Sequence, residues 1–330
     1  MTYHAERQAA IEAVRQAALY CRAVQETFQV EDTLTKRDRS PVTVADYGAQ
    51  ALVLRRLRAA FPDDGIVAEE DCADLQSEEN TALRERLLGL VSRFLPGVSE
   101  AEVVAAIGSG SSEGGAEGRF WVLDPVDGTK GFLRKEQYAI ALGLLQDGQV
   151  VLGVLGCPNL PFRGEDGTES SGCLFVAVRG EGVTVYALEG DAQRRAEVAE
   201  VGSVTAAVLC ESVESGHSSH GDAERVRELL GITAPSLRMD SQAKYGAVAR
   251  GDASIYLRLS PSAEYREKIW DHAAGAIVVQ EAGGTVTDAE GNPLDFSRGR
   301  RLEKNRGILA APPSIHAQVL AAVREVTGRG

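Results

Sequence analysis

Two aspartates lie close together in a short segment whose residue types suit metal-assisted chemistry. Residues 119–132 read Arg-Phe-Trp-Val-Leu-Asp-Pro-Val-Asp-Gly-Thr-Lys-Gly-Phe. The apolar run Phe120–Leu123 is typical of a strand, and Pro125, which has no N–H for a sheet ladder, predicts that the strand stops there. Asp124 and Asp127 then lie three residues apart at a strand end, where both carboxylates can converge on one point. Mg²⁺ takes such oxygen ligands together with substrate phosphates, so the segment predicts a metal-dependent site for phosphoryl chemistry.

Further carboxylates fall where other predicted elements begin or end: Asp46, Glu69, Glu70 and Asp271. Each also has an ordinary structural explanation. An aspartate in a first helical turn can simply cap the helix, and an acidic turn is often only solvated. The Asp124–Thr129 segment, too, can be read as an Asx-turn that closes a strand. The functional interpretation therefore requires the fold to bring these clusters together, which spacing alone does not show.

The composition of the 330-residue chain narrows the classes of function. A net charge of −13 argues against a nucleic-acid surface, which needs a basic stripe. No apolar run approaches the roughly 18 residues of a membrane span, so no membrane association is expected. The N-terminal residues resemble neither a signal nor a transit peptide. We expect a cytoplasmic protein, or one of an organelle such as the plastid if a transit peptide has been removed, acting as a monomer or homodimer.

The first half of the chain is predicted to form helices and then an antiparallel sheet. Apolar residues recur every three or four positions over residues 5–28 and again up to Ala60, as on amphipathic helices. Asp147-Gly148 between two apolar runs predicts a type I′ hairpin within a meander of strands. The remaining predicted segments are a strand at 65–68, helical residues 78–106 broken at 95–97, a glycine-rich, mobile surface loop at 108–118, and strands at 138–145, 150–155, 173–178 and 182–187.

From about residue 200 the pattern changes to alternating strands and helices, which is typical of an α/β unit. The predicted order is strand 206–210, helix 222–230, strand 236–239, helix 241–249, strand 253–259, helix 271–282, strand 285–288 and a terminal helix 314–326. Asp271 is expected to open its helix and Ser314 to cap the last one. We therefore predict an antiparallel-sheet subdomain over residues 1–199 and a smaller α/β subdomain over 200–330.

Four blocks of the sequence resemble the lithium-sensitive, magnesium-dependent phosphatases of the inositol monophosphatase superfamily. These blocks are Ser40–Tyr47, Phe61–Asp64 with Glu69-Glu70, Trp121–Leu133, and Lys268–Gly275. The 3′(2′),5′-bisphosphate nucleotidase branch is matched more closely, through Lys130–Phe132, Gly216–His220, Asp240–Tyr245 and Tyr256–Arg258. The likeness runs from about residue 5 to 325 and implies an α/β fold with a layered α-β-α-β-α sandwich.

The resemblance also implies a role for each matching position. The positions that resemble metal ligands are Glu69, Asp124, Asp127, Asp271 and the carbonyl of Val126, with Glu70 behind them. Asp46 and Thr129 resemble the pair that activates water. The residues that resemble contacts to the substrate, an adenosine with its 5′-phosphate, are His217, Ser241, Lys244 and Arg258, joined by Thr129 and Asp271. Two to three Mg²⁺ ions are implied, because two metals can hold both the attacking and the leaving oxygen of an in-line displacement.

The reaction that the resemblance implies is hydrolysis of the 3′-phosphate of a small-molecule nucleotide. The substrate would be adenosine 3′,5′-bisphosphate, with its sulfated form PAPS, giving AMP or APS and phosphate in a lithium-inhibited step of sulfur metabolism. An inositol polyphosphate 1-phosphatase, or a broader sugar-phosphate phosphatase, is the alternative, because Lys244 and Arg258 can accept another distal phosphate. A nucleotide sensor with little turnover is an alternative of another class, although such a protein need not keep Asp46 and Thr129.

Two of the five cysteines fall at the ends of consecutive predicted strands. Cys157 closes one strand and Cys173 opens the next. If these strands are antiparallel neighbours, the two Cα atoms can lie within the roughly 4.4–6.8 Å that a disulfide spans. Two reduced thiols are the first expectation in a large intracellular chain. A redox switch that tethers this hairpin is the alternative.

Overall fold

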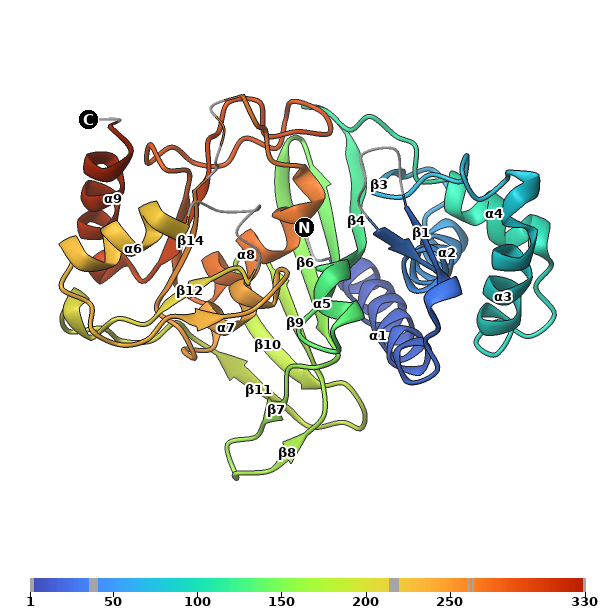
Figure 1. Ribbon diagram of the computed structural model, residues 1–330, viewed down its shortest axis with the longest axis horizontal. Coiled ribbons are helices and arrows are strands. Elements are labelled where there is room, and N and C mark those ends of the chain that lie inside the picture. The colour runs from blue at the N-terminus through green and yellow to red at the C-terminus, as the bar shows by residue number, and fades with distance from the viewer. Residues whose placement is uncertain (1–2, 36–40, 214–219, 260–261, 263, 329–330) are drawn as a thin grey trace.

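The computed structural model describes the chain apart from residues 1–2, 36–40, 214–219, 260–261, 263 and 329–330. Its helices and sheets stack in five layers in the order helix, sheet, helix, sheet, helix (Figure 1). This arrangement confirms the predicted α/β class and the layered sandwich. Within the described part of the chain, no helix is both long and apolar enough to cross a membrane.

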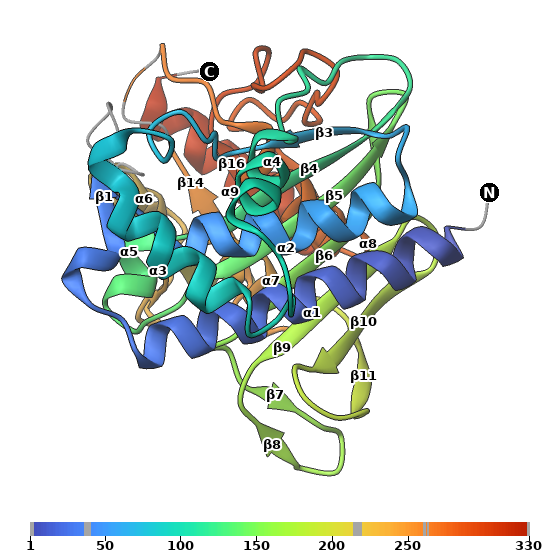
Figure 2. The ribbon, with the colours of Figure 1, turned by 90° about the vertical axis from the view of Figure 1, so that its right-hand side faces the viewer.

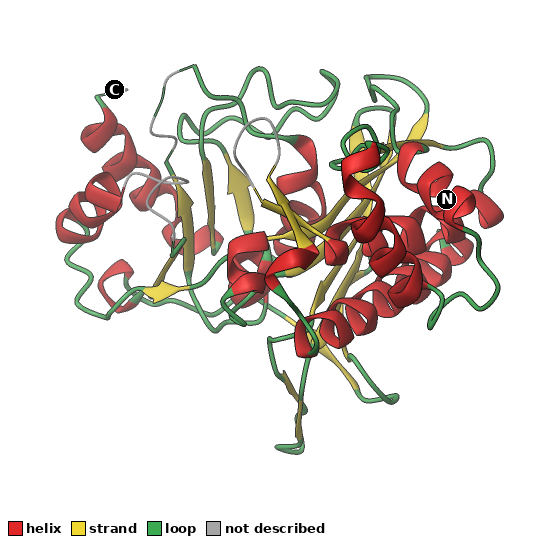
Figure 3. Cartoon of the chain, turned by 45° about the vertical axis from the view of Figure 1, so that its right-hand side comes forward, coloured by secondary structure: helices red, strands yellow, loops and turns green. Residues whose placement is uncertain are grey.

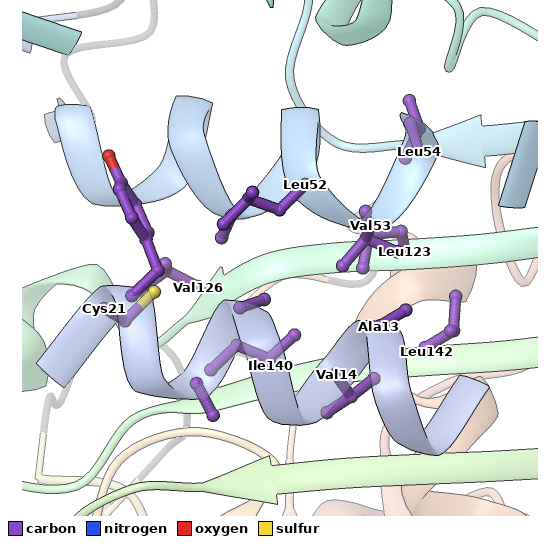
Figure 4. Close-up of a cluster of buried hydrophobic side chains, with 14 of the residues drawn as sticks. Ala13, Val14, Cys21, Leu52, Val53, Leu54, Leu123, Val126, Ile140 and Leu142 are labelled. Carbon is purple, nitrogen blue, oxygen red and sulfur yellow. The ribbon is translucent and has the colours of Figure 1, made fainter. Parts of the chain in front are cut away.

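The first outer layer consists of α1 (His4–Glu26) and α2 (Val44–Ala60), which lie across one face of the larger sheet (Figure 2). Gly48 permits their close approach, because a Cβ at this position would lie 2.0 Å from the Tyr20 hydroxyl oxygen. That hydroxyl donates to the Val44 carbonyl (2.7 Å) and so fixes the first turn of α2. The apolar side chains packed between these helices and the sheet include Val14 of α1, Leu52 and Val53 of α2, and Leu123 and Ile140 of the sheet (Figure 4).

The larger sheet has seven strands in the order β11-β10-β9-β6-β5-β4-β3. Neighbouring strands run antiparallel, as the predicted meander requires, except that β3 is parallel to β4. Asp147 (φ 50°) and Gly148 (φ 74°) confirm the type I′ hairpin, because both have positive φ. The strands are β3 (Gly65–Ala68), β4 (Arg119–Asp127), β5 (Ala139–Gln146), β6 (Gln149–Cys157), β9 (Cys173–Val178), β10 (Gly182–Ala187) and β11 (Gln193–Ala196), of which β11 was not predicted.

The smaller sheet has five strands in the order β13-β12-β14-β16-β15. The strands β12, β13 and β14 are mutually parallel, and β16 is antiparallel to both of its neighbours. The strand β16 was missed because its four residues, Ile-Leu-Ala-Ala, are all buried and show no alternation. The bounds are β12 (Leu209–Glu211), β13 (Leu237–Arg238), β14 (Ile255–Arg258), β15 (Thr285–Thr287) and β16 (Ile308–Ala311).

The two sheets are separated by a layer that contains α7 (Ala243–Ala249) and α8 (Ala273–Glu281). The second outer layer consists of α6 (His220–Leu229) and α9 (Pro313–Thr327), so both groups of strands are flanked by helices (Figure 3). Apolar residues of α8, such as Ile277, share one core with strands of the larger sheet. Because this core joins the two parts of the chain, the expected subdomain boundary near residue 200 stays a prediction.

The remaining elements are short and lie at the edges of the layers. A pair of strands precedes α2, and a second pair forms a hairpin that projects from the larger sheet (Figure 1). The helices α3 and α4 pack beside α2. In chain order these elements are η1 (Val30–Asp32), β1 (Thr33–Thr35), β2 (Pro41–Thr43), η2 (Glu78–Asn80), α3 (Thr81–Val91), α4 (Glu100–Gly108), α5 (Thr129–Leu133), β7 (Phe162–Arg163), β8 (Glu169–Ser170), η3 (Val204–Ala206) and η4 (Ile269–Asp271).

The structure corrects the prediction that the strand before the two aspartates stops at Pro125. The strand β4 continues to Asp127, and its register with β5 shifts between Asp124 and Asp127. Asp124 pairs with Ala141 and Asp127 with Ala139, so β4 carries one extra residue at this point. Such a bulge tolerates the missing N–H of proline and re-aims the side chains around it.

Two predicted helix starts are also wrong. Asp271 ends the 3₁₀ turn η4, and α8 begins two residues later, after His272 with φ −137°. Ser314 lies inside α9 rather than at its N-cap, which is Pro312, and its hydroxyl donates to the Val201 carbonyl (3.2 Å). In both places, the polar side chain that the local pattern assigns to a helix cap instead lies in a turn or makes a tertiary contact.

The glycine-rich segment 108–118 is in part attached to the larger sheet, although a mobile surface loop was expected. The Ala68 N–H donates to the Gly110 carbonyl, and the Ser112 N–H donates to the Ile66 carbonyl, both at 2.9 Å. Gly110 is required here, because a Cβ at this position would lie 2.5 Å from the Cβ of Ala68. The segment therefore covers the edge of β3 immediately before Glu69.

Candidate active site

The bulge of β4 forms the centre of the candidate site. Asp124 is almost fully buried, with 2% of its surface exposed, and Asp127 accepts a hydrogen bond from the Gln242 N–H (2.6 Å). The chain then turns at Gly128, whose φ of 86° favours glycine, and enters α5. This turn places the hydroxyl of Thr129 on the same side as the Val126 carbonyl, which lies 3.3 Å away.

Asp46 and Thr129 are in contact, as the resemblance implied. The Thr129 hydroxyl donates to Asp46 Oδ1 (3.3 Å). The other oxygen of Asp46 accepts from the backbone N–H (2.8 Å) and the hydroxyl (2.7 Å) of Thr43, in a capping box at the start of α2. Asp46 is therefore both a helix-capping residue and a hydrogen-bond partner of Thr129, and its role in activating water stays a prediction.

The acidic side chains of the site repel one another strongly. Burial raises the pKa of Asp124 well above its ordinary value, and the nearby charges of Glu69 and Asp127 raise it further. Burial likewise raises the pKa of Asp127, and it raises the pKa of Asp271 well above the usual range. These mutual effects indicate that carboxylates from three separate segments, after β3, in β4 and in η4, lie near one another.

This cluster fits a divalent cation. Among the described residues, Asp124 Oδ1 is a buried oxygen without a hydrogen-bond partner. A buried acceptor without a donor is costly, and a cation would satisfy it while removing the repulsion between the carboxylates. An all-oxygen donor set is the one that hard cations such as Mg²⁺ prefer.

Glu70 directly follows Glu69 in the sequence and is buried, and its expected place behind the metal ligands stays a prediction. Its backbone N–H donates to the side-chain oxygen of Gln50 (3.1 Å), and its carbonyl accepts from the amide nitrogen of Gln50 (2.6 Å). The side chain of Gln50 therefore fixes the turn that follows β3 and carries Glu69.

Arg258 and Asp271 meet on the other side of the cluster, 3.7 Å apart. Arg258 is paired with buried Glu267 through contacts of 3.1 and 2.7 Å. Burial acts to raise the pKa of Glu267, but Arg258 and a hydrogen bond from His272 lower it to about 2. The imidazole of His272 lies 3.2 Å from Glu267 and 2.8 Å from the Tyr245 hydroxyl.

Sequence reasoning missed Glu267, His272, Tyr245 and Gln242 as parts of the site. The side chain of Gln242 donates to the Trp270 carbonyl (2.8 Å) and accepts from the Gly275 N–H (3.0 Å), which holds the turn that carries Asp271. Tyr245 and His272 lie within matched blocks, so their position was the only available signal. Their partnership depends on contacts between residues far apart in the sequence.

The expected substrate contacts lie beside this turn as far as the structure describes them. Lys244 is buried, its ammonium donates to the Met239 carbonyl (3.3 Å), and it lies 5.3 Å from the centre of the Tyr256 ring. Burial lowers the pKa of Lys244, against the opposing charge of Asp127. Ser241 has φ 69° and accepts from the Ala243 N–H (3.1 Å). His217 lies outside the described residues.

Cys157 and Cys173 lie directly opposite each other on the antiparallel strands β6 and β9, as predicted. Both thiols are free and fully buried. Burial raises the pKa of Cys157 well above its ordinary value and that of Cys173 to about 12. Because the thiolate is the reactive form, this environment suits the reduced pair. A redox function for the two cysteines stays a prediction.

The match to a family model, together with the five-layered fold, places this protein among the phosphatases of a generally metal-dependent family. The chain belongs to the inositol monophosphatase family, whose model matches residues 3–327. The IMPase of Thermotoga maritima has the same fold, with a TM-score of 0.67 at 22% identity over 97% of this chain and 96% of that one.

Relatives of higher identity cover the chain over almost its whole length. A protein of Emericella nidulans named 3′(2′),5′-bisphosphate nucleotidase is 45% identical over 352 residues, covering 99% of each chain. A protein of the same name from Oryza sativa is 47% identical over 339 residues, covering 98% of this chain and 94% of its own. One from Schizosaccharomyces pombe is 43% identical over 346 residues, covering 100% and 98%.

Proposed function

We propose that this protein is a Mg²⁺-dependent 3′(2′),5′-bisphosphate nucleotidase. Its reaction would be hydrolysis of the 3′-phosphate of adenosine 3′,5′-bisphosphate, and of PAPS, to AMP or APS and phosphate. The observation that carries the proposal is the contact between Asp46 and Thr129 beside the buried, repelling carboxylates at the β4 bulge. The names of relatives at 43–47% identity over nearly full length support the choice of substrate.

In this proposal four carboxylates and one carbonyl would hold two to three Mg²⁺ ions: Glu69, Asp124, Asp127, Asp271 and the carbonyl of Val126. The bound ions would supply charge stabilisation for the attacking and the leaving oxygens. Thr129 would orient the attacking water, since its hydroxyl donates to Asp46 and leaves the oxygen free to accept a proton. Asp46, whose other oxygen accepts hydrogen bonds from Thr43, would then accept the proton that the Thr129 hydroxyl releases.

Positively charged residues would bind the phosphate that is retained. Burial raises the pKa of Asp127, and Lys244 and Arg258 lie close enough for their charges to act against that rise. An arginine can hold a phosphate through two parallel hydrogen bonds, which a lysine cannot do. We assign the 5′-phosphate to these two residues, with Ser241 and His217 beside them.

A phosphate-release panel tests this function. We expect adenosine 3′,5′-bisphosphate and PAPS to be hydrolysed faster than inositol 1,4-bisphosphate in Mg²⁺, and lithium to inhibit release because Li⁺ also prefers oxygen ligands. A higher kcat/KM for inositol 1,4-bisphosphate would instead indicate an inositol polyphosphate 1-phosphatase. Tight nucleotide binding with negligible release of phosphate would indicate a sensor.

Arg258→Lys tests the assignment of the 5′-phosphate. We expect KM for adenosine 3′,5′-bisphosphate to rise about tenfold, since a charged hydrogen bond contributes roughly 1.5–3 kcal/mol and lysine loses the two-point contact. Adenosine 3′-monophosphate, which lacks the 5′-phosphate, is the matched control and should change little. An equal loss with both substrates would show that Arg258 acts through its neighbour Asp271 instead.

A further inference from the structure

Residues 300–302 form a strap against the segment that leads to Asp271. The Ile269 N–H donates to the Arg300 carbonyl (3.2 Å), and the Leu302 N–H donates to the Glu267 carbonyl (2.9 Å). Lys268 and Arg301 form an isolated antiparallel bridge between these two bonds. The backbone of the strap is therefore attached to the turn that presents Asp271.

The side chain of Arg300 reaches from this strap to the opposite part of the molecule. Its guanidinium donates to the Ala68 carbonyl (2.7 Å) and to the Ser112 carbonyl (3.0 Å). Ala68 is the last residue of β3 and immediately precedes Glu69. Ser112 belongs to the segment that pairs with the edge of β3. The Arg300 side chain thus links residues 300–302 both to the end of β3 and to the segment that covers its edge.

The same guanidinium also contacts the residue before Asp271. Its central carbon lies 4.8 Å from the centre of the Trp270 ring, and the Lys268 ammonium lies 5.2 Å from that ring. Trp270 is buried. A planar guanidinium can stack on an aromatic face while its edge donates hydrogen bonds. Arg300 therefore contacts the residues that immediately precede two of the proposed metal ligands, Glu69 and Asp271.

We propose that Arg300 is a positioning residue that fixes Glu69 relative to Asp271 and so sets the geometry of the metal site. The proposal rests on the proposed function only in that it takes these two carboxylates as metal ligands. The two residues lie on different parts of the fold, and Arg300 touches the chain beside both. Groups that orient metal ligands typically contribute 10–100-fold to metal affinity or activity.

Mn²⁺ binding to the metal-free protein, measured by titration calorimetry, tests the role of Arg300 without an assay of activity. We expect Arg300→Gln to weaken Mn²⁺ binding by about tenfold or more, because the amide cannot bridge both carbonyls and stack on Trp270. Arg301→Gln is the matched control. This substitution removes the same charge from the same strap. The guanidinium of Arg301 donates instead to the Arg266 carbonyl (3.3 Å), so we expect Arg301→Gln to alter Mn²⁺ affinity less than twofold.

Arg300→Lys distinguishes a geometric role from a contribution to folding. Lysine keeps the charge but not the planar fork, so we expect a folded protein with an intermediate loss of Mn²⁺ affinity and a raised half-saturating Mg²⁺ concentration. Unchanged KM for substrate at saturating Mg²⁺ would support a role limited to the metal site. Wild-type Mn²⁺ affinity in a folded Arg300→Gln or Arg300→Lys variant would overturn the proposal.

Asp124→Asn in the same titration separates this proposal from the proposed function. If Asp124→Asn loses Mn²⁺ binding while Arg300→Gln does not, the metal site is supported and the positioning role of Arg300 is wrong. If the unmodified chain binds no Mn²⁺, the proposed metal site is wrong, and so is the positioning role of Arg300.

Discussion

Asp124→Asn is expected to reduce phosphate release by about three orders of magnitude or more. Asp124 lies within the carboxylate cluster, and its Oδ1 is one of the buried oxygens that lack a hydrogen-bond partner among the described residues. Loss of a metal ligand removes several kcal/mol of transition-state stabilisation, and each 1.4 kcal/mol corresponds to a factor of ten in rate. Steady-state assays over a range of Mg²⁺ concentrations measure the effect.

The same variant should make the metal-free protein more stable at neutral pH. The folded state raises the pKa of Asp124 above its ordinary value of 3.8, so the ionised carboxylate destabilises the fold. This penalty is absent below the unfolded-state pKa, grows as the pH rises from the unfolded-state pKa to the folded-state pKa, and is complete above the latter. We expect a higher Tm for metal-free Asp124→Asn at neutral pH, and a smaller increase in Tm on adding Mg²⁺. A lower Tm, or activity near that of the wild type, would contradict the assignment.

Asp46→Asn is expected to lower kcat by about 10²–10⁴-fold, the range that a positioned acid–base group contributes. The amide can still accept from the Thr43 N–H, but its NH₂ group would then face Thr129. The Thr129 hydroxyl would lose the acceptor that takes up its proton, while the proposed metal ligands would remain. Stopped-time phosphate release at saturating Mg²⁺ and substrate isolates this effect on kcat.

Two controls define the outcome for Asp46→Asn. Mn²⁺ titration should give an affinity close to that of the wild type, which separates the loss of proton acceptance from a loss of metal. Thr129→Ser keeps the hydroxyl and should retain most activity, whereas Thr129→Val should resemble Asp46→Asn. Full activity of Asp46→Asn would show that Asp46 serves only as the capping residue of α2.

The local elements of the fold were largely predictable from short-range patterns. The strand at 65–68, the strands at 173–178 and 182–187, and the Asp147-Gly148 hairpin all occur as expected, because alternation and turn chemistry act over a few residues. The failures occur where tertiary contacts override a local rule. Pro125 does not end β4, since a bulge against β5 accommodates it.

The site was predictable in its residue types but not in its supporting contacts. The convergence of Asp124, Asp127 and Asp271 was expected from matched blocks of sequence and agrees with their raised pKa values. The contacts that join Arg258, Glu267, His272 and Tyr245 left no pattern in the sequence, although Arg258, His272 and Tyr245 lie within matched blocks. These residues come from a strand, a loop and two helix regions, so only their packing makes them partners.

The sequence by itself determined the chemistry that Asp124-Pro-Val-Asp-Gly-Thr129 can perform, because oxygen ligands, a turn glycine and a hydroxyl are local properties of six residues. The tertiary structure decided which other side chains reach that segment and how firmly they are held. Most strands of the two sheets lie between Glu69 and Asp271 in the sequence. Contacts such as those of Arg300 bring the segments around these two residues together. Such contacts depend on how whole layers pack, and no short stretch of sequence encodes that packing.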